Sequence, residues 1–339
     1  LSTPLIHILL IRFSSLGDVA MTVPVVTAFS QANPHCKVSI LTKKQFTPLF
    51  HHLPEVSVIG VDFKTDYKGL YGLFKLAKKI KDLRVDVVAD MHNNLRTKIL
   101  RFLLPNVSFS TLDKGRSEKK QLIKGTVFKP LKTGVERYAD VFRAFGLELS
   151  LSKPHFPQPL PLPKALKTHL KGCKKPYIGI APFAAYTSKM YPIQQMKEVI
   201  STLSNTYSVL LFGGGAYETK IIEAIVCQYP GVKSVAGIYT MQEELTLMTH
   251  LKVMLAMDSG NAHMAAMMGV NVITLWGVTH PYAGFAPFNQ PLENCLLSDR
   301  HKYPKIPTSI YGNRHPKSYE NAMASIPVEE VLSAVKKAI

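Results

Sequence analysis

The sequence predicts an α/β protein built from two βαβ domains in tandem. Short apolar runs alternate with longer helical patterns through the 339 residues, which is typical of parallel sheets whose faces are covered by helices. Residues 150–163 interrupt this alternation with five prolines, and proline at that density favours a stiff extended connector over a helix or strand. We therefore expect a first domain at 1–153, a linker at 154–163 and a second domain at 164–339.

The apolar runs place the expected strands in order along the chain. They lie near 5–11, 37–41, 56–60, 85–89 and 107–109 in the first domain, and near 176–181, 207–212, 232–235, 252–257 and 271–276 in the second. Ser325 to Glu330 carries a proline followed by acids, a typical helix start. We expect a final helix that reaches about Ala338 and packs back toward the first domain, and a cleft between the two domains where the strand ends meet.

The composition excludes several classes of protein. Hydrophobic residues make up 46% and charged residues 19%, as in an ordinary globular chain and unlike a disordered one. No apolar stretch approaches the roughly 18 residues that span a bilayer, and the run at 5–11 is too short and lacks the preceding basic region of a signal peptide. The four cysteines are too scattered for a metal knuckle or a disulfide framework, which fits a reducing cytoplasm: Cys36, Cys173, Cys227 and Cys295.

The formal net charge of +18 favours a polyanionic partner such as nucleic acid, an anionic membrane or a phosphorylated substrate. Seven basic residues and the single acid Glu118 lie between Lys114 and Lys132, interspersed with glycines and apolar residues. We interpret this segment as a mobile basic loop with apolar anchors that meets a polyanion. The alternative is a solvated loop that only aids solubility. No interleaved aromatic and basic motif and no zinc spacing supports nucleic-acid binding.

The first turn has an unusual set of polar residues. The apolar run at 5–11 enters a turn at 12–18, and an apolar helical pattern follows from Val19 to Phe29. The hydroxyls of Ser14 and Ser15, with the amides of a new helix, suit an anion or a hydroxylated substrate, while Gly17 permits a tight path. Asp18 would repel a phosphate and therefore suits a general base. The alternative is that Asp18 only caps the helix or favours its dipole.

Two turns in the second half follow predicted strands. The first, at 181–192, carries Lys189, which can neutralise a leaving phosphate or simply be solvated. The second, at 211–218, has three successive glycines that allow close backbone approach, and its Glu218 can accept hydrogen bonds from a ribose or sugar hydroxyl. Neither the spaced dinucleotide fingerprint nor the phosphate loop ending in Gly-Lys-Ser/Thr is present here.

The segment at 257–270 carries the strongest signal. We expect a strand to end at Asp258 and a helix to start near Ser259, so that the backbone amides of Ser259, Gly260 and Asn261 form an anion site. His263 lies about one turn further, on the face that returns toward the strand end. The alternatives are that Asp258 is only a helix cap and that His263 is a buried histidine bonded to a neighbouring loop.

In their order along the chain, these motifs resemble the lipopolysaccharide heptosyltransferases of glycosyltransferase family nine. The resemblance rests on Ser-Ser-Leu-Gly-Asp, the lysine loop, Gly-Gly-Gly-Ala-x-x-Glu, Asp-Ser-Gly-x-x-His-x-Ala-Ala and Leu-Trp-Gly-x-Thr-x-Pro, and extends to 90–96 and 136–138. It implies a GT-B architecture of two Rossmann-like domains and an inverting, metal-independent transferase without a cofactor. The implied reaction moves heptose from ADP-heptose to Kdo-lipid A or an inner-core heptose.

The resemblance also implies roles for individual residues. Asp18 would be the base on the acceptor hydroxyl, Lys189 would bind the donor phosphates and Glu218 the ribose. Donor binding would involve Gly213, Gly214, Glu218, Asp258, Ser259, Gly260, Asn261 and His263. Acceptor binding would involve Ser14, Ser15, Gly17, His92, Asn93 and Arg96, with Lys119, Lys120 and Lys124 of the basic segment. No residue is expected to hold a metal.

The implied partners are an ADP-sugar donor, a phosphorylated lipid A or core acceptor and the anionic surface of the inner membrane, but no nucleic acid. The protein would act as a monomer, cytoplasmic and peripheral on the inner face of that membrane. Three positions depart from the family pattern: Ala181 to Phe183 replace a glycine-led start, Tyr191 replaces tryptophan after Lys189, and His280 replaces an acid before proline. Other nucleotide-sugar transferases, nucleotide-sugar epimerases and a non-enzymatic polyanion-binding protein remain alternatives.

Overall fold

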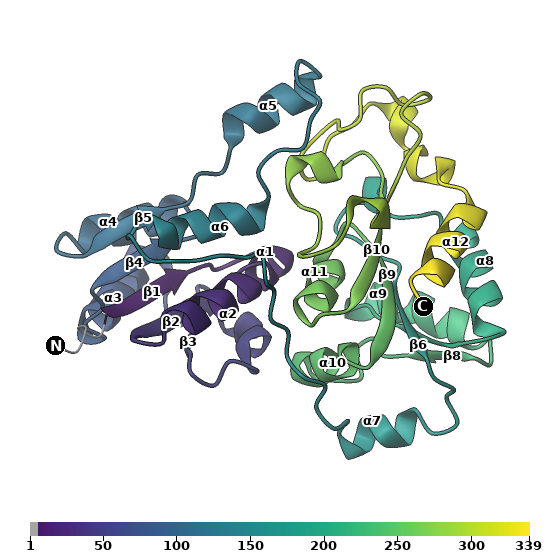
Figure 1. Cartoon of the computed structure of the whole chain (residues 1–339), viewed down its shortest axis with the longest axis horizontal. Helices are drawn as coiled ribbons and strands as arrows, with labels where there is room; N and C mark the ends of the chain where they lie inside the picture. Colours follow the sequence, from purple (N-terminus) through teal and green to yellow (C-terminus); the bar gives the residue numbers. More distant parts are fainter. Residues whose placement is uncertain (1–5) are drawn as a thin grey trace. The chain divides into compact units, whose positions relative to one another are not determined.

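The computed structural model describes residues 6–339, which form two compact units (Figure 1). The first unit contains residues 6–114 and Gly134–His155, and the second contains Gly115–Thr133 and Phe156–Ile339. The second boundary, between residues 155 and 156, falls inside the proline-rich segment. The first unit differs from the predicted domain at one place, because the basic segment at 115–133 groups with the second unit.

The first unit is a five-stranded parallel sheet in the order β3-β2-β1-β4-β5. Its strands are β1 (Ile6–Ile11), β2 (Cys36–Lys43), β3 (Ser57–Val61), β4 (Val87–Asp90) and β5 (Ser108–Thr111). Its helices are α1 (Leu16–Ala20), α2 (Val23–Ala32), the 3-10 helix η1 (Lys44–Phe50), α3 (Gly69–Asp82), α4 (Leu95–Leu103) and α6 (Gly134–Arg143).

Successive side chains of β1 point to opposite faces of this sheet and show which helices cover each face. Leu9 and Ile11 join a core that includes residues of α3 and α4, so this helix pair covers one face. Ile8 and Leu10 are equally buried and point to the other face. There α2 packs on α6, with the rings of Phe29 and Phe142 stacked 4.2 Å apart.

The expected helix from Val19 to Phe29 is divided in two. α1 ends at Ala20 and α2 begins at Val23, with Pro24 in the first turn of α2. Proline has no N–H to donate to the preceding turn, so it opens a new helix instead of continuing the first. The turn at 12–18 therefore leads into the short helix α1, which is separate from the core helix α2.

The second unit is a six-stranded parallel sheet in the order β11-β10-β9-β6-β7-β8. Its strands are β6 (Tyr177–Ala181), β7 (Ser208–Leu211), β8 (Val232–Ser234), β9 (Leu251–Met257), β10 (Asn271–Trp276) and β11 (Cys295–Leu297). The sequence prediction missed β11, which has only three residues and pairs at the sheet edge with β10.

The helices of the second unit lie between and after these strands. They are α5 (Arg116–Lys124), α7 (Lys164–His169), α8 (Ile193–Ser204), α9 (Gly215–Val226), α10 (Met241–Met248), α11 (Gly260–Met267) and α12 (Val328–Lys337). Short 3-10 turns are η2 (Thr187–Lys189), η3 (Pro281–Ala283), η4 (Leu292–Asn294), η5 (Lys317–Tyr319) and η6 (Ala322–Ser325).

One expectation about this unit is wrong. The basic segment is not a loop throughout, because residues 116–124 form α5 between left-handed glycines at Gly115 and Gly125. The last helix, α12, packs on α8, and its Val331 and Val335 are buried in the hydrophobic core of the second unit. Its packing toward the first domain stays a prediction. Among residues 6–339, no helix is long and apolar enough to cross a membrane.

Both sheets change direction once in their strand order. In the first, β1 lies between β2 and β4, and in the second, β6 lies between β7 and β9. The chain therefore leaves neighbouring strands toward opposite sides at these two points, which opens a crevice at their carboxyl ends where α/β proteins bind ligands. The loops after β1, β4, β6 and β9 contain most of the residues that the sequence analysis selected.

The position of α3 depends on a residue without a side chain. A Cβ atom at Gly72 would overlap the backbone carbonyl group of Tyr67, which cannot move as a flexible side chain can. We expect Gly72→Ala to lower the free energy of unfolding by about 3 kcal/mol, measured by urea denaturation. Gly214→Ala is the matched control, because a Cβ there meets nothing within 4 Å. Equal stability of the two variants would contradict this packing.

Candidate active site

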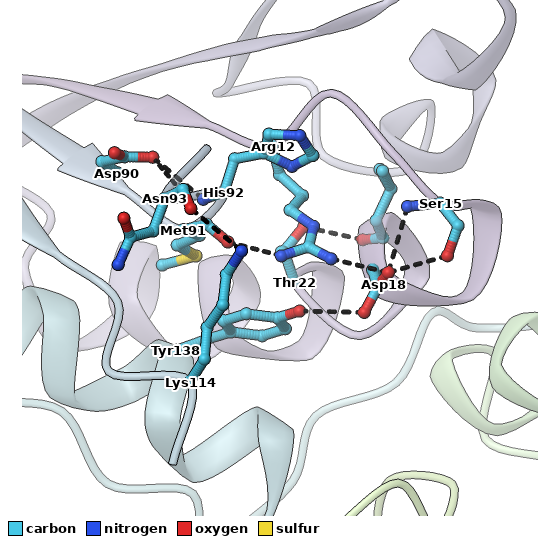
Figure 2. Close-up of polar contacts among 11 residues, drawn as sticks. Arg12, Ser15, Asp18, Thr22, Asp90, Met91, His92, Asn93, Lys114 and Tyr138 are labelled. Atoms are coloured by element: carbon cyan, nitrogen blue, oxygen red, sulfur yellow. Dashed lines mark hydrogen bonds and ion pairs between the residues drawn. The ribbon is translucent and has the colours of Figure 1, made fainter. Parts of the chain in front are cut away.

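The turn after β1 holds Asp18 in a fixed orientation (Figure 2). Ser15 precedes the first residue of α1, and both its backbone N–H and its hydroxyl donate to Oδ2 of Asp18, at 3.1 and 2.7 Å. The same oxygen lies 2.6 Å from the guanidinium Nη2 of Arg12. The other oxygen, Oδ1, has a longer contact with the Tyr138 hydroxyl, at 3.4 Å. Oδ2 therefore fixes the carboxylate, and Oδ1 is the oxygen better placed to take a proton.

The charge state of Asp18 results from opposing influences. Burial by itself raises the pKa of this carboxyl, but the charge of Arg12 and the hydrogen bonds from Ser15 outweigh burial and hold the pKa below its ordinary value of 3.8. Its side chain keeps 23% of its surface exposed. Asp18 is therefore an accessible carboxylate, ionised at physiological pH.

Arg12 connects the two loops at the switch point of the first sheet. Its Nη1 donates to the carbonyl oxygen of Met91 after β4 at 2.6 Å, while Nη2 holds Asp18 after β1. The guanidinium also lies 5.5 Å from the centre of the Tyr138 ring of α6. Neither Arg12 nor Tyr138 is assigned a role from the sequence alone. The available signal is a charged residue directly after an apolar strand whose last five residues are buried.

The loop after β4 is fixed by its own carboxylate. Asp90 Oδ1 accepts hydrogen bonds from the backbone N–H groups of His92 and Asn93, at 3.0 and 2.8 Å. Asn93 has a left-handed φ of 45°, and its carbonyl oxygen accepts from Lys114 Nζ at 2.9 Å. Figure 2 shows His92 near Arg12 and Asn93 beside Lys114. The turn therefore presents both predicted acceptor residues on a rigid backbone.

His92 is a neutral imidazole in this environment. Burial, followed by the positive charges of Arg12 and Lys114, lowers the pKa of His92 to about 3. Its Nδ1 is buried and has no hydrogen-bond partner within the part of the chain that the structure describes. A buried polar atom without a partner is costly, so this nitrogen suits a hydroxyl of a bound substrate.

The remaining acceptor candidates lie in two different places in the first unit. Ser14 and Gly17 lie in the same turn as Asp18 and are partly buried. Arg96, in the first turn of α4, is exposed and stacks over the Phe63 ring at 4.7 Å. The structure thus groups Ser14, Ser15 and Gly17 around Asp18 but holds Arg96 on an aromatic ring.

Lys189 and Asp258 form the corresponding ion pair in the second unit. Lys189 Nζ lies 2.8 Å from Asp258 Oδ2, and the two side chains keep only 12% and 9% of their surface exposed. The hydroxyl of Thr279 donates to the same Oδ2 at 2.9 Å. Asp258 is therefore not primarily a helix cap: it holds the lysine of one loop at the end of the neighbouring strand. Thr279 is a further site residue that the sequence analysis left without a role.

The loop that carries Lys189 is packed against distant glycines. Ser188 donates its hydroxyl hydrogen bond to the Gly312 carbonyl oxygen at 2.5 Å. A Cβ at Gly312 would come within 2.6 Å of Lys189 Cδ, and a Cβ at Gly277 would overlap the carbonyl oxygen of Ser188. Glycine at both positions lets these backbones approach closely enough to fix the direction of the lysine side chain.

The N-terminus of α11 lies directly after Asp258. Ser259 is the N-cap residue, but its side chain makes no capping hydrogen bond, and its hydroxyl is buried without a partner in the described residues. Gly260 and Asn261 open the helix, and His263 follows one turn later at 7% exposure. The first amides of the helix and the Ser259 hydroxyl can therefore donate to an anion beside Lys189.

The glycine turn after β7 uses its acid to stabilise itself. Glu218 Oε2 accepts a hydrogen bond from the backbone N–H of Gly214 at 2.8 Å. A Cβ at Gly213 would meet Ile222 Cδ1 at 2.8 Å, whereas the space around Gly214 is open. Oε2 of Glu218 thus holds the turn, and the expected contact of Glu218 with a ribose stays a prediction.

Two departures from the family pattern have local structural reasons. His280 is the N-cap of η3, and its Nδ1 accepts from the backbone N–H of Tyr282 at 3.1 Å. Burial and the charge of Arg300 lower the pKa of His280 to about 4, so it is neutral and serves as the acceptor that an acid would otherwise supply. Tyr191 is buried in the core and donates its hydroxyl to the Ile326 carbonyl oxygen at 2.7 Å.

The basic segment contributes to a pocket within the second unit. Lys119 lies 4.3 Å from the centre of the Phe285 ring, and Lys120 is exposed. Lys124 lines a cavity of about 560 Å³ together with Arg300, which stacks 3.6 Å from the centre of the Phe128 ring. The other charged or titratable groups of its lining are cationic side chains and an imidazole: Lys305, Arg314 and His315. No carboxylate lines this cavity, so it suits an anion.

Among residues 6–339, no group of three or more His, Cys, Asp or Glu side chains is placed to hold a metal ion. The pairs Arg12–Asp18 and Lys189–Asp258 each consist of one acid and one base.

Comparisons with known proteins agree on one family. The family described as Glycosyltransferase family 9 (heptosyltransferase) matches residues 73–313. "Lipopolysaccharide heptosyltransferase 3" of Escherichia coli is 25% identical over 335 residues, covering 95% of this chain and 96% of the relative. "Lipopolysaccharide core heptosyltransferase OpsX" of Haemophilus influenzae is 24% identical over 340 residues, covering 97% and 95%.

Two solved structures show the same fold. A glycosyl transferase family 9 protein from Veillonella parvula superposes with a TM-score of 0.76 at 18% identity, covering 100% of this chain and 98% of that one. E. coli heptosyltransferase WaaC with ADP gives a TM-score of 0.69 at 16% identity, covering 98% and 100%. Both of these similarities span the whole chain, so the two-unit α/β architecture is that of GT-B heptosyltransferase structures.

The Arg12–Asp18 pair predicts a specific pH dependence of stability. Because the pKa of Asp18 is lowered in the folded protein, the pair stabilises the fold above the ordinary carboxyl pKa of 3.8 and loses this effect as the pH falls through the lowered value. We expect Arg12→Met to cost about 3 kcal/mol at neutral pH, and the difference from wild type to shrink below about pH 4.

Urea denaturation between pH 7 and pH 3 measures this difference. Arg96→Met is the control, since Arg96 contacts a ring and its loss should give a small, pH-independent change. A difference between wild type and Arg12→Met that stays constant with pH would contradict the assigned role of the ion pair.

Proposed function

The chain belongs to glycosyltransferase family 9, and from this premise we propose that it transfers heptose from ADP-heptose to a hydroxyl of the lipopolysaccharide core. The relatives named for this activity cover nearly the whole chain at 23–25% identity. One observation supports the proposal most directly: each sheet carries an ion pair at its switch point, with Asp18 in the first unit and Lys189 in the second. Asp18 supplies a base for the acceptor, and Lys189 supplies a cation for the donor.

The first unit binds the acceptor through the loops after β1 and β4. The acceptor hydroxyl donates to Oδ1 of Asp18, while Nδ1 of His92 and the hydroxyls of Ser14 and Ser15 bind neighbouring sugar hydroxyls. A carboxylate with a low pKa is a weak base. It can still accept the proton late in the reaction, once the acceptor oxygen has begun to bond to the sugar carbon and become acidic.

The second unit binds the donor through Lys189 and the N-terminus of α11. The diphosphate lies beside the Lys189 ammonium and accepts hydrogen bonds from the Ser259 hydroxyl and the amides of Gly260 and Asn261, with His263 one turn further along. Asp258 does not touch the phosphates in this arrangement, since its charge would repel them; it positions Lys189. Glu218 closes the glycine turn and orients it toward the ribose.

The transfer is a single displacement. The acceptor oxygen bonds to the anomeric carbon as the bond from that carbon to the diphosphate oxygen breaks, and the proton passes to Asp18. Attack opposite to the leaving group inverts the configuration, through an oxocarbenium-like transition state. Lys189 and the helix amides stabilise the negative charge that develops on the diphosphate, the role that a divalent ion has in other transferases. We therefore propose a metal-independent reaction.

The acceptor is a phosphorylated lipid A or core sugar, either Kdo-lipid A or an inner-core heptose. The cavity lined by Lys124, Arg300 and Arg314 is the proposed site for its phosphates, because its cations have no carboxylate among the lining residues to neutralise them. Lys119 and Lys120 of α5 extend the positive surface. In this proposal the protein acts as a monomer, peripheral on the cytoplasmic face of the inner membrane.

The assignment of Asp18 is tested by Asp18→Asn, which keeps the shape but removes the base. We expect kcat to fall by about 10²-fold or more with little change in ADP affinity, because proton transfer is lost and donor binding is not. Steady-state kinetics and calorimetry measure the two quantities. Asp66→Asn, an exposed carboxylate of the same unit, should retain kcat. Turnover near wild type by folded Asp18→Asn would remove Asp18 as the base.

The donor site is tested by Lys189→Met in the full-length protein. We expect ADP affinity to fall at least tenfold, because the variant loses a cation and leaves the Asp258 carboxylate unpaired near the phosphates. Calorimetry in EDTA and in magnesium should give the same affinity for wild type. Lys220→Met, an exposed lysine on α9, is the control and should bind ADP normally. ADP binding that strictly requires magnesium would contradict the metal-independent mechanism.

A further inference from the structure

The first turns of α3 expose apolar side chains to solvent, where a surface helix normally carries polar ones. Its inner side, with Leu73, Leu76 and Ile80, is buried against the sheet. Its first turns also expose Leu70 at 64%, Tyr71 at 83% and Phe74 at 57%. Phe74 follows Leu70 by four residues and Tyr71 by three, so its side chain neighbours both of theirs on the helix surface.

Helix α4 extends this apolar surface. α3 and α4 pack against each other on the same face of the sheet (Figure 1). Leu95 and Phe102 of α4 are exposed at 73% and 84%, and their separation of seven residues puts them on one side of the helix. Of the 13 large hydrophobic side chains exposed in the described residues, these two helices carry five. Single exposed apolar residues are ordinary on protein surfaces, but such a cluster indicates a binding surface.

The charges among these residues are almost all positive. α3 contributes four lysines and α4 contributes two arginines and a lysine, while Asp82 is the single acid in the two helices. The cations are Lys75, Lys78, Lys79, Lys81, Arg96, Lys98 and Arg101, and all are exposed. Aromatic and aliphatic side chains surrounded by lysine and arginine fit the boundary between lipid headgroups and acyl chains.

We propose that this surface of α3 and α4, the α3–α4 face, docks the protein on a bilayer that contains anionic phospholipid. Tyr71, Phe74 and Phe102 enter the headgroup region, and the surrounding lysines bind lipid phosphates. A second copy of the chain is a poorer occupant, since seven cations and one acid on each copy would repel. The proposal rests on the proposed function only in that a lipid-linked acceptor lies at such a surface.

Vesicle flotation tests the α3–α4 face with the full-length protein. The two vesicle types are pure phosphatidylcholine and a 3:1 mixture of phosphatidylcholine with phosphatidylglycerol. We expect wild type to partition at least tenfold more strongly to the anionic vesicles at low salt, and Tyr71→Ser/Phe74→Ser/Phe102→Ser to reduce that partition coefficient at least tenfold. These side chains are exposed, so the thermal melting temperature should stay close to that of wild type.

A matched control variant changes three exposed apolar residues of the second unit: Leu160→Ser, Ile238→Ser and Leu292→Ser. It should float like wild type. A second variant, Lys75→Gln/Lys78→Gln/Lys98→Gln, should lose its binding mainly at low salt, because added ions screen the lysines but not the apolar contact. Vesicle binding that neither face variant reduces more than the control does would overturn the proposal.

Two further measurements separate this proposal from its alternatives. A dimer detected by sedimentation and abolished by the triple serine variant, with vesicle binding unchanged, would assign the face to a second copy and overturn the membrane assignment. Heptosyl transfer to a water-soluble core fragment reports on the proposed function independently, and the triple serine variant should retain it. Loss of that soluble transfer together with unchanged vesicle binding would also overturn the proposal, since the face would then serve the reaction and not the membrane.

Discussion

The reversal of strand order in each sheet is the constraint on which the rest of the site depends. At a switch point two neighbouring strands end together, but their loops leave in opposite directions, so the backbone does not join them. In both units a charged side chain does so, through a hydrogen bond to a carbonyl oxygen in the first and through an ion pair in the second. Arg12 binds Asp18 after β1 and the Met91 carbonyl after β4, while Lys189 after β6 binds Asp258 after β9. The same groups that hold the loops together are the ones suited to chemistry.

There is an energetic reason why the groups that hold the loops are also the groups suited to chemistry. A buried charge without a partner is costly, so the proposed base Asp18 and the proposed phosphate-binding Lys189 both need a counter-ion. Each pair meets this need and leaves a reactive atom available. Asp18 uses Oδ2 for Arg12 and Ser15 and keeps Oδ1 for a long contact with Tyr138. The first amides of α11 and the Ser259 hydroxyl follow directly after Asp258, the partner of Lys189, and form the proposed binding site of the diphosphate.

Two of the residues that depart from the family pattern, His280 and Tyr191, each make a local hydrogen bond in this chain. The first turn of η3 needs an acceptor, and neutral His280 supplies one through Nδ1. Tyr191 reaches the Ile326 carbonyl through its hydroxyl from within the core. Both hydrogen bonds are made to groups other than the Lys189–Asp258 pair.

The sequence by itself determined the two parallel-sheet units, ten of the eleven strands, and the positions of Asp18, Lys189 and Asp258 at strand ends, because apolar periodicity and turn residues are local signals. Tertiary structure decided the contacts and the packing that these local signals do not encode. The contacts of Asp18 with Tyr138, of Arg12 with Met91 and of Asp258 with Thr279 join segments that are separated in sequence. α5 joined the second unit, and α12 packed on α8. Whether Glu218 holds a turn or faces a ligand also depended on geometry, since a carboxylate bonds whichever N–H the folded backbone brings within reach.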